Sequence, residues 1–570
     1  MKLRLLAAAA LIAPPFLAPM AAAAQAQPRF DRTLLARHVQ ILSSDAYEGR
    51  GPATRGETKT VDYIIRQFSA AGLLPGGEVV NGQRGWTQRV PLLKSDIVGQ
   101  PRLSLNLGGA AVPLTQGNEI SVRAPMNGAS RVALANAPLL FVGYGTSAPE
   151  RGWDDYKGVD VRGKMLVMLV NDPDFEGGEG DFGGKAMTYY GRWTYKFEQA
   201  AKLGAAGVLL IHETAPASYG WATVKNSNTN TMFDIVRANP AGSHTPLESW
   251  IQRDVAERLF RDSGTTLEAA KRAARTKAFR PMPLKATMSA NYDATTSTIT
   301  SYNVAGVVPG KTRPAETVIY TAHHDHLGIG QPDANGDRIY NGAIDNGTGI
   351  AQLIEQGRAF AKGPRPHRSV VFLAVGAEEK GLLGSEYYVA NPLYPLESTV
   401  GVINTDGGNV FGRARDFSIS GSAKLELLDM LISEGKRAGR SYFPEENVGA
   451  GYFFRSDHFP FAKRGVPAIS FRRGNDFVVG GKTRGIALQE DYTAKRYHQP
   501  DDEYDPNWDF TGMVDDSILL HRLGQRLANG QMWPQWSEDS EFRAVRDRSA
   551  GERAAPQAQP RPVRAPGERG

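Results

Sequence analysis

The chain has 570 residues and no cysteine, and its formal net charge is +6. The length exceeds one compact core and predicts two or three domains, while the missing thiols exclude disulfides, thiol nucleophiles and cysteine-ligated zinc. The excess positive charge lies at the ends, because residues 1–24 contribute +2 and residues 543–570 contribute +4. Residues 25–542 are formally neutral, so we expect no basic face and no nucleic-acid partner.

The first 24 residues have the three parts of an export signal. Lys2 and Arg4 precede an apolar run over residues 5–17, and small residues fill 21–24. The run is too short for a membrane span. We therefore expect residues 1–24 to be a cleaved signal peptide, and the mature protein to be periplasmic or secreted, without a membrane span.

Periodic apolar residues predict helices over much of 30–74, and short alternating strands follow over 86–123. From residue 301, β-rich apolar segments alternate with helical patterns, which is typical of a largely parallel sheet with helices on its faces. We therefore predict an α/β fold, with a mostly parallel mixed sheet flanked by helices and a smaller β-rich insert. The expected division is a catalytic domain in two parts, over 28–125 and 286–535, an insert over 126–285, and a disordered Arg/Pro-rich tail over 536–570.

Acidic and histidine side chains follow the predicted strands where each strand ends. His323 follows the first strand, Glu378 and Glu379 follow the second, Asp406 follows the third, and Asp345 precedes a helix. Ligands of open parallel sheets gather at the carboxyl ends of the strands, so these side chains can converge. Clustered carboxylates repel one another unless a cation lies among them. The residue types favour a divalent metal, with zinc first and manganese or cobalt as other occupants.

The motifs as a set resemble the two-zinc exopeptidase family of secreted bacterial leucyl aminopeptidases and glutamate carboxypeptidase. They are His323-His324-Asp325, Asp345-Asn346, Glu378-Glu379-Lys380-Gly381-Leu382, Asn404-Thr405-Asp406 and Tyr497-His498-Gln499-Pro500. Residues 142–145, 154–158 and 204–208 are similar to a protease-associated domain, which would be the insert. The resemblance implies the zinc exopeptidase fold.

The resemblance also implies two zinc ions per chain and a role for each ligand. Asp345 would bridge both ions. Glu379 and His498 would complete one site, and His323 and Asp406 would complete the other.

Further roles follow from the same resemblance. Glu378 would be the general base, and Asp325 would orient His323 through the second ring nitrogen of that histidine. Asp457 and His458 would support the site without binding metal. His324 and His326 are expected to be packed or to lie behind the ligands. Tyr452 is a candidate for stabilising an oxyanion.

The resemblance implies an exported aminopeptidase that removes amino-terminal residues from peptides with a metal-activated water. One alternative is a carboxypeptidase or dipeptidase, in which Arg472 and Arg473 would hold a substrate carboxylate. Others are a glutaminyl cyclase-like transferase with a single zinc, and a non-catalytic binding protein that keeps the fold. Gly407 and Gly408 replace the bulky residue that many members have after this aspartate, so the floor near that metal is expected to be more open. The sequence leaves the oligomeric state, the native metal and the side-chain preference open.

Overall fold

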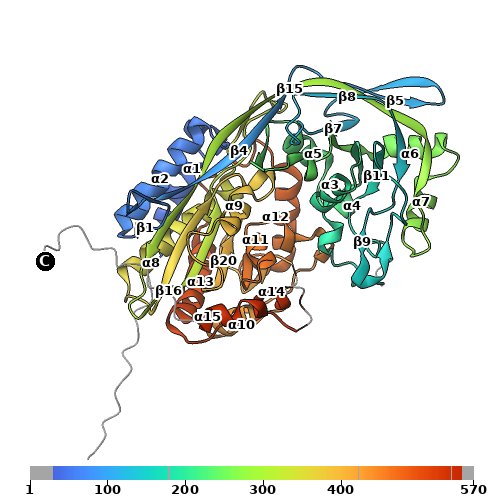
Figure 1. Ribbon diagram of the computed structural model, residues 1–570. Coiled ribbons are helices and arrows are strands. Elements are labelled where there is room, and N and C mark those ends of the chain that lie inside the picture. Colours follow the sequence, from blue (N-terminus) through green and yellow to red (C-terminus); the bar gives the residue numbers. More distant parts are fainter. Residues whose placement is uncertain (1–29, 178–179, 422, 539, 541, 555–570) are drawn as a thin grey trace, which may run out of the picture.

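The computed structural model describes residues 30–177, 180–421, 423–538, 540 and 542–554 (Figure 1). The predicted signal peptide, residues 1–24, lies outside the described residues, and export stays a prediction. None of the described helices combines the length with the apolar character that a membrane span requires.

The first of two units is built on a mixed sheet whose central strands are parallel. In spatial order these strands are β15 (Met282–Val308), β19 (Arg368–Val375), β16 (Arg313–His323), β20 (Thr399–Thr405) and β23 (Ala468–Arg473). β19, β16, β20 and β23 run parallel, while β15 is antiparallel to β19. β21 (Asp416–Ile419) adds an antiparallel strand beside β23. The mostly parallel sheet predicted from the sequence is confirmed.

Helices cover both faces of this sheet. One face carries α2 (Arg55–Ala71), α8 (Gly349–Lys362), α10 (Glu426–Arg437) and α13 (Thr511–Asn529), and α1 (Arg32–Leu42) packs beside α8; the other carries α9 (Leu383–Ala390) and α11 (His458–Lys463). Side chains alternate along a strand, so Val318 and Tyr320 of β16 pack under the first helices while Ile319 packs under the second. A strand buried on both faces is expected to be apolar throughout, which explains the short apolar runs in the sequence.

The second unit has its own sheet and its own core. Its strands, in spatial order, are β8 (Arg131–Phe141), β11 (Met165–Leu169), β12 (Gly207–His212), β14 (Leu247–Gln252) and β7 (Ile120–Val122). The first four are parallel and β7 is antiparallel to β14. α6 (Arg253–Asp262) and α7 (Leu267–Ala274) pack on one face of this sheet, and α3 (Trp193–Lys202) packs on the other.

The boundary predicted for the insert, residue 126, is wrong. β5 (Arg102–Leu107) and β6 (Ala110–Leu114) form a hairpin, and β5 pairs with residues 286–291 of β15 in the second sheet. β15 then continues into the first sheet, where residues 294–304 pair with β4 (Thr87–Ile97). The second unit therefore begins near residue 98, and the long strand β15 connects the two sheets (Figure 1). Strand pairing, which the pattern of short strands does not reveal, decides this boundary.

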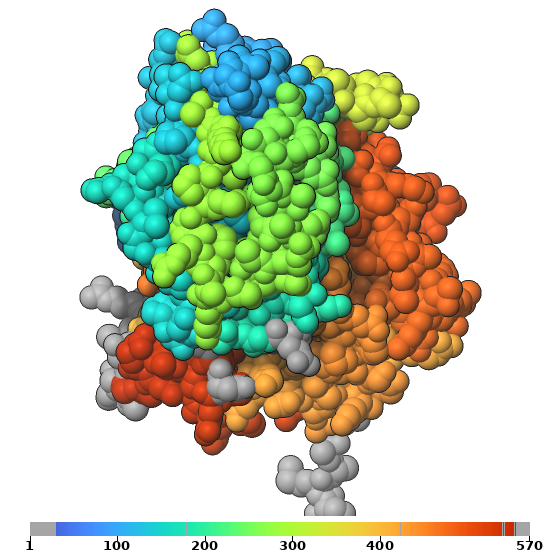
Figure 2. Space-filling model, turned by 90° about the vertical axis from the view of Figure 1, so that its right-hand side faces the viewer, coloured from blue at the N-terminus to red at the C-terminus, as the bar shows by residue number. Residues whose placement is uncertain are grey.

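The second unit lies against the edge of the first sheet at which the parallel strands end. β13 (Met232–Ile235) leaves the second unit and pairs with β4, and α5 (Trp221–Asn228) precedes it. Figure 2 shows the surface of the second unit, cyan to green, beside the orange surface of the carboxy-terminal half. Residues of α5 can therefore reach the strand ends of the first unit.

Part of the predicted disordered tail is ordered. Trp536 is buried, and its Nε1 donates a hydrogen bond of 3.0 Å to the carbonyl of Gly465. Two short helices follow, α14 (Arg543–Arg548) and α15 (Ala550–Ala554). The Arg546 guanidinium is buried and donates to the Thr399 carbonyl at 3.1 Å, which attaches this segment to the sheet. Residues 555–570 lie outside the described residues.

Candidate metal centre

The predicted ligands occupy the carboxyl ends of the parallel strands. His323 is the last residue of β16, Glu378 and Glu379 form a short turn after β19, and Asp406 follows β20. Asp345 lies in a helical turn, Ala343–Thr348, directly before α8. The parallel register places these strand ends at one edge, because Thr321 of β16 is level with Leu373 of β19 and Asn404 of β20.

One half of the centre consists of His323, Asp345 and Asp406. The Nε2 atom of His323 lies 3.2 Å from Oδ1 of Asp345 and 3.3 Å from Oδ1 of Asp406. His323 is buried, so its ring has a fixed direction. The three ligand atoms lie within 4.8 Å of one another, which is close enough for one ion.

The other half consists of His498, Asp345 and Glu379. His498 lies in the loop after α12 (Gly481–Lys495), and its Nε2 is 2.9 Å from Oε2 of Glu379 and 3.4 Å from Oδ2 of Asp345. Asp345 thus offers Oδ1 to one histidine and Oδ2 to the other. All five predicted ligands converge.

His326 also lies in this centre, whereas the sequence predicted a ring that is packed or lies behind the ligands. Its Nδ1 lies 2.6 Å from Oε1 of Glu379, and it forms a third potential ligand group with Asp345 and Glu379. Nothing in the sequence separates it from His324, which is buried and donates a hydrogen bond of 2.8 Å to the Tyr302 carbonyl instead. The chain direction after β16 decides which of these histidines faces the carboxylates.

Asp325 is placed differently from the prediction. Its Oδ1 accepts the amide of Glu378 at 3.0 Å and its Oδ2 accepts the amide of Glu379 at 3.3 Å. The same carboxylate is 3.8 Å from Nδ1 of His323, which is too long for a hydrogen bond, and that nitrogen instead lies 3.2 Å from the backbone carbonyl of Asp325. Asp325 therefore holds the Glu378–Glu379 turn, and its backbone orients His323.

Asp457 and His458 are in none of the potential ligand groups of the described residues. Asp457 accepts a hydrogen bond of 2.6 Å from the Ser385 hydroxyl, and the His458 ring packs edge-on against Phe453. This agrees with the supporting role expected from the sequence. Tyr452 stacks with the guanidinium groups of Arg455 and Arg472, which leaves its proposed oxyanion role a prediction.

Two buried groups that the sequence did not identify hold the turn of Asp345. The Asp502 carboxylate accepts the amides of Ile344 and Asp345, at 3.1 Å and 3.0 Å. The Arg50 guanidinium donates to the carbonyls of Gly342 and Asn341. The segment around Arg50 resembles the family in sequence. The contacts of Arg50, however, join positions almost 300 residues apart, and the sequence does not reveal them.

The charges of the centre suit a cation. Burial raises the pKa of Asp345, but hydrogen bonds from His323 and His498 outweigh it and hold the pKa well below its usual value. Burial lowers the pKa of His498, yet the carboxylates of Glu379 and Asp345 raise it to about 9. The protons on these histidines compensate for negative charge that metal ions would otherwise balance. The histidine and carboxylate donors therefore fit zinc, and the chain offers no thiols.

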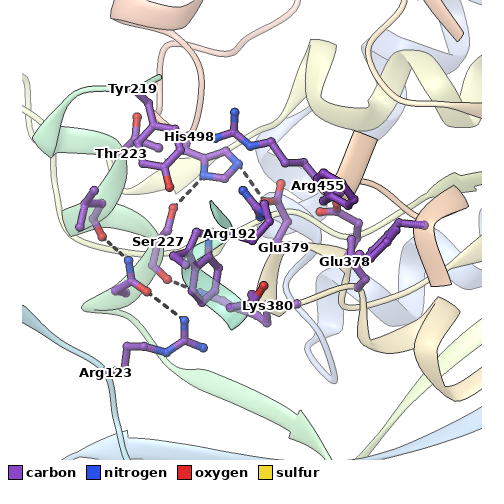
Figure 3. Close-up of a pocket in the computed structure, with 18 of the residues that line it drawn as sticks. Arg123, Arg192, Tyr219, Thr223, Ser227, Glu378, Glu379, Lys380, Arg455 and His498 are labelled. Atoms are coloured by element: carbon purple, nitrogen blue, oxygen red, sulfur yellow. Dashed lines mark hydrogen bonds and ion pairs between the residues drawn. The ribbon is translucent and has the colours of Figure 1, made fainter. Parts of the chain in front are cut away.

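The second unit supports one of the ligands. The Ser227 hydroxyl of α5 lies 2.8 Å from Nδ1 of His498 (Figure 3). Asn226 donates to the His498 carbonyl at 3.0 Å. Lys380, next to the Glu378–Glu379 turn, donates to the Ser227 carbonyl at 3.2 Å. A cavity of about 140 Å³ opens here, lined by Arg192 and other residues of both units.

Comparison with known proteins agrees with this geometry. Residues 303–520 match the model of peptidase family M28. The chain is 31% identical over 166 residues to aminopeptidase NAALADL1 of Mus musculus, and 27% identical over 180 residues to aminopeptidase YwaD of Bacillus subtilis (strain 168). These alignments cover 25% and 31% of this chain, but only 21% and 36% of those relatives. The chain thus spans well under half the length of the curated relatives it matches.

A solved structure extends the likeness of the fold beyond this segment. The aminopeptidase from Aneurinibacillus sp. strain AM-1 has a similar fold, with a TM-score of 0.51 and 19% identity, and the match covers 89% of this chain and 96% of that chain. The family match, the α/β sheet and the ligands at its strand ends point the same way. Over residues 303–520, the chain is therefore similar to peptidase family M28, which agrees with the resemblance of its motifs.

Proposed function

We propose that this chain is an exported two-zinc aminopeptidase that hydrolyses amino-terminal residues from peptides. The position of Asp345 carries the proposal, because its Oδ1 lies 3.2 Å from His323 Nε2 and its Oδ2 lies 3.4 Å from His498 Nε2. One carboxylate facing two sets of donors is the arrangement of a ligand that bridges two ions. Asp406 completes the set of His323, and Glu379 completes that of His498.

Zinc bound here would polarise the scissile carbonyl and lower the pKa of the attacking water. Glu378 is the proposed general base, which takes a proton from that water and passes it to the leaving amine. Burial raises the pKa of Glu378 well above its usual value, although the nearby His323 opposes this shift. A carboxylate with a raised pKa is a stronger base and suits proton transfer near neutral pH.

Access to Glu378 runs between the two units. Tyr189 and Trp193 of the second unit line the cavity of about 140 Å³ that also contains Glu378 and Glu379. A space of this size favours short peptides over folded proteins. The second unit would therefore restrict the length of the substrate as well as support His498.

Replacement of Glu378 tests the proposed function most directly. We expect Glu378→Gln to keep its zinc and to lose activity on amino-acid anilides by about 10³-fold, because general base catalysis contributes about 10² to 10⁴. Zinc content by atomic absorption and kcat/KM on leucine p-nitroanilide provide the two measurements. Glu198→Gln is a matched control, because Glu198 lines the same cavity and belongs to no potential ligand group of the described residues.

The control should keep activity close to that of the unmodified chain. Undiminished hydrolysis by Glu378→Gln with full zinc content contradicts its role as base. A chain that binds zinc but cleaves amino-blocked peptides as fast as free ones contradicts the aminopeptidase assignment.

A further inference from the structure

A second cavity of about 140 Å³ opens beside the metal centre, next to the first cavity. Asp345 and Asp406 form part of its wall, so a group bound there lies beside the reacting atoms. Its volume suits one amino-acid side chain. Arg472 and Arg473, at the end of β23, line the same cavity.

The sheet register explains why these arginines lie near the metal ligands. β20 and β23 are parallel, and Thr405 of β20 is level with Phe471 of β23. The next residues along the two strands are Asp406 and Arg472, followed by Gly407 and Arg473. The arginines, which are the last residues of β23, therefore lie at the same edge of the sheet as Asp406.

The two arginines differ in their partners. Arg472 forms an ion pair with Glu445 and lies over the ring of Tyr452 at 4.2 Å. Arg473 has no ion pair with a carboxylate among the residues that the structure describes. Its polar contacts are the side chain of Gln489 at 3.2 Å, and the Asn475 side chain and Gly474 carbonyl at 3.3 Å.

Arg473 nevertheless stays charged. Burial lowers the pKa of its guanidinium to about 10, which still leaves it protonated at neutral pH. Two acidic groups, Asp516 and Asp416, favour its charge, but neither forms an ion pair with Arg473 in the described part of the chain. Asp516 pairs with Arg440 at 2.7 Å, and Asp416 accepts the amide of Asp476 at 2.8 Å. A largely buried charge without a carboxylate partner is costly, and a carboxylate ligand would offset that cost.

The rest of the cavity leaves room for such a ligand. The Arg473 guanidinium lies 5.3 Å from the ring centre of Phe411 and 5.6 Å from that of Phe477, which holds it in place. Gly407, next to Asp406, has only one heavy atom within 4.0 Å of the position a side chain would take. No side chain therefore stands between the metal centre and the cavity at that point.

We propose that this cavity binds the acidic side chain of the substrate's amino-terminal residue, Asp or Glu, with Arg473 as its ion-pair partner. Gln489 orients the guanidinium, and the ring of Phe411, which lines the cavity, contacts the methylene groups of the side chain. The proposal rests on the proposed aminopeptidase activity, and it names the class of substrate that the activity prefers.

Glutamate and glutamine anilides test this preference, because they differ only in charge. We expect kcat/KM for glutamate p-nitroanilide to exceed that for glutamine p-nitroanilide by about 10-fold or more. The reason is that a hydrogen bond from a charged arginine to a carboxylate is stronger than one to a neutral amide. Arg473→Met keeps the apolar stem and should reduce the glutamate-to-glutamine ratio to about one or below, with the glutamine rate changed little. Arg415→Met, which removes an exposed arginine paired with Asp476, is the matched control and should keep the ratio.

The ratio in the unmodified chain is informative even if Arg473→Met fails to fold. Equal rates on the two anilides, or a preference for glutamine, overturn the proposal. A further arm compares alanyl dipeptides with free and amidated carboxyl ends. The unmodified chain could require the free carboxyl end, and Arg473→Met could remove that requirement, while the glutamate and glutamine anilides react at equal rates. Such a result would mean that Arg473 binds the α-carboxylate of the substrate, and it would overturn the side-chain assignment.

Direct binding separates this proposal from the proposed function. Isoglutamine, the α-amide of glutamate, and glutamine amide bind through the same backbone and differ in side-chain charge. In calorimetry, isoglutamine should bind at least 10-fold more tightly than glutamine amide, and this difference should require Arg473. Such a result supports the carboxylate site even if no anilide is hydrolysed. Equal binding of the two overturns it.

Discussion

The two halves of the metal centre are built in different ways. His323 and Asp406 come from the ends of β16 and β20, so the central sheet of the first unit positions both. His498 lies in a loop, and its ring is held by Ser227 from the second unit at 2.8 Å. Asp345 serves both halves, through Oδ1 on one side and Oδ2 on the other.

Because of this difference, only one half of the centre is independent of the second unit. Parallel strands that pair along their length fix the direction of the residues that follow them, so the half of His323 needs only the first unit. The half of His498 depends on how the second unit packs against the strand ends. We expect the two proposed metal sites to respond differently to changes in the second unit.

The largest effect is expected from Asp345→Ala, which removes the residue that both halves share. When catalytic residues act together, removing one of them reduces activity about as much as removing all of them. We therefore expect activity to fall by about 10⁴-fold or more. Zinc content should fall below one ion per chain, whereas His498→Ala should keep close to one. Equal zinc content in the two variants would contradict a bridging role for Asp345.

A smaller effect is expected from Ser227→Ala, which acts on the half of His498 alone. Loss of a hydrogen bond behind a metal ligand costs about 10 to 100-fold in affinity, so one of two zinc ions should bind that much more weakly. Competition titration with a chelator measures the two dissociation constants. Ser121→Ala is the matched control, because Ser121 is buried in the same unit and its hydroxyl has no hydrogen-bond partner within the described part of the chain. Equal weakening of both ions would show that the halves are not independent.

The smallest effect concerns the first unit by itself and is a pH dependence. Burial raises the pKa of Glu57 to about 7, although hydrogen bonds from Ser301, Ala53 and Tyr302 oppose this shift. Because the folded pKa is raised, Glu57 stabilises the fold fully below the unfolded pKa near 4.5, and this contribution is lost as the pH rises through 7. The full loss is about 3 kcal/mol at 1.36 kcal/mol per pKa unit.

Glu57→Gln isolates this contribution, because glutamine resembles the protonated acid at every pH. Urea unfolding between pH 5 and pH 8 should show the unmodified chain losing stability relative to the variant as the pH rises. A difference that stays constant with pH would contradict the raised pKa. Zinc binding by the half of His498 should not change.

Much of the site was predictable because its chemistry lies in short segments. His323, Glu379 and Asp406 directly follow apolar strands, and the position of such residues follows from local pattern alone. The position of His326 beside Glu379 was not specified, because a histidine next to Asp325 has no local mark that distinguishes a packed ring from one that faces Glu379. Ser227 was missed because its contact with His498 joins residues 271 positions apart.

The boundary of the insert shows the same limit. Strands β5 and β6 are evident as short alternating segments, but their pairing with β15 assigns them to the second sheet. The ordered structure of part of residues 536–554 was not predicted for a related reason. Trp536 and Arg546 are held by contacts with Gly465 and Thr399, which are distant in the sequence. An Arg/Pro-rich composition predicts disorder only where such contacts are lacking.

The sequence alone determined the α/β architecture, and it predicted a metal held by histidine and carboxylate together with its candidate ligands, because strand periodicity and residue chemistry are local properties. The tertiary structure decided what those residues face. It showed that Asp325 holds the Glu378–Glu379 turn and that the second unit supports His498. It also showed that Arg473 lines a cavity beside Asp406 without a carboxylate partner among the described residues. Such contacts between distant segments depend on how strands pair and units pack, which no local pattern records.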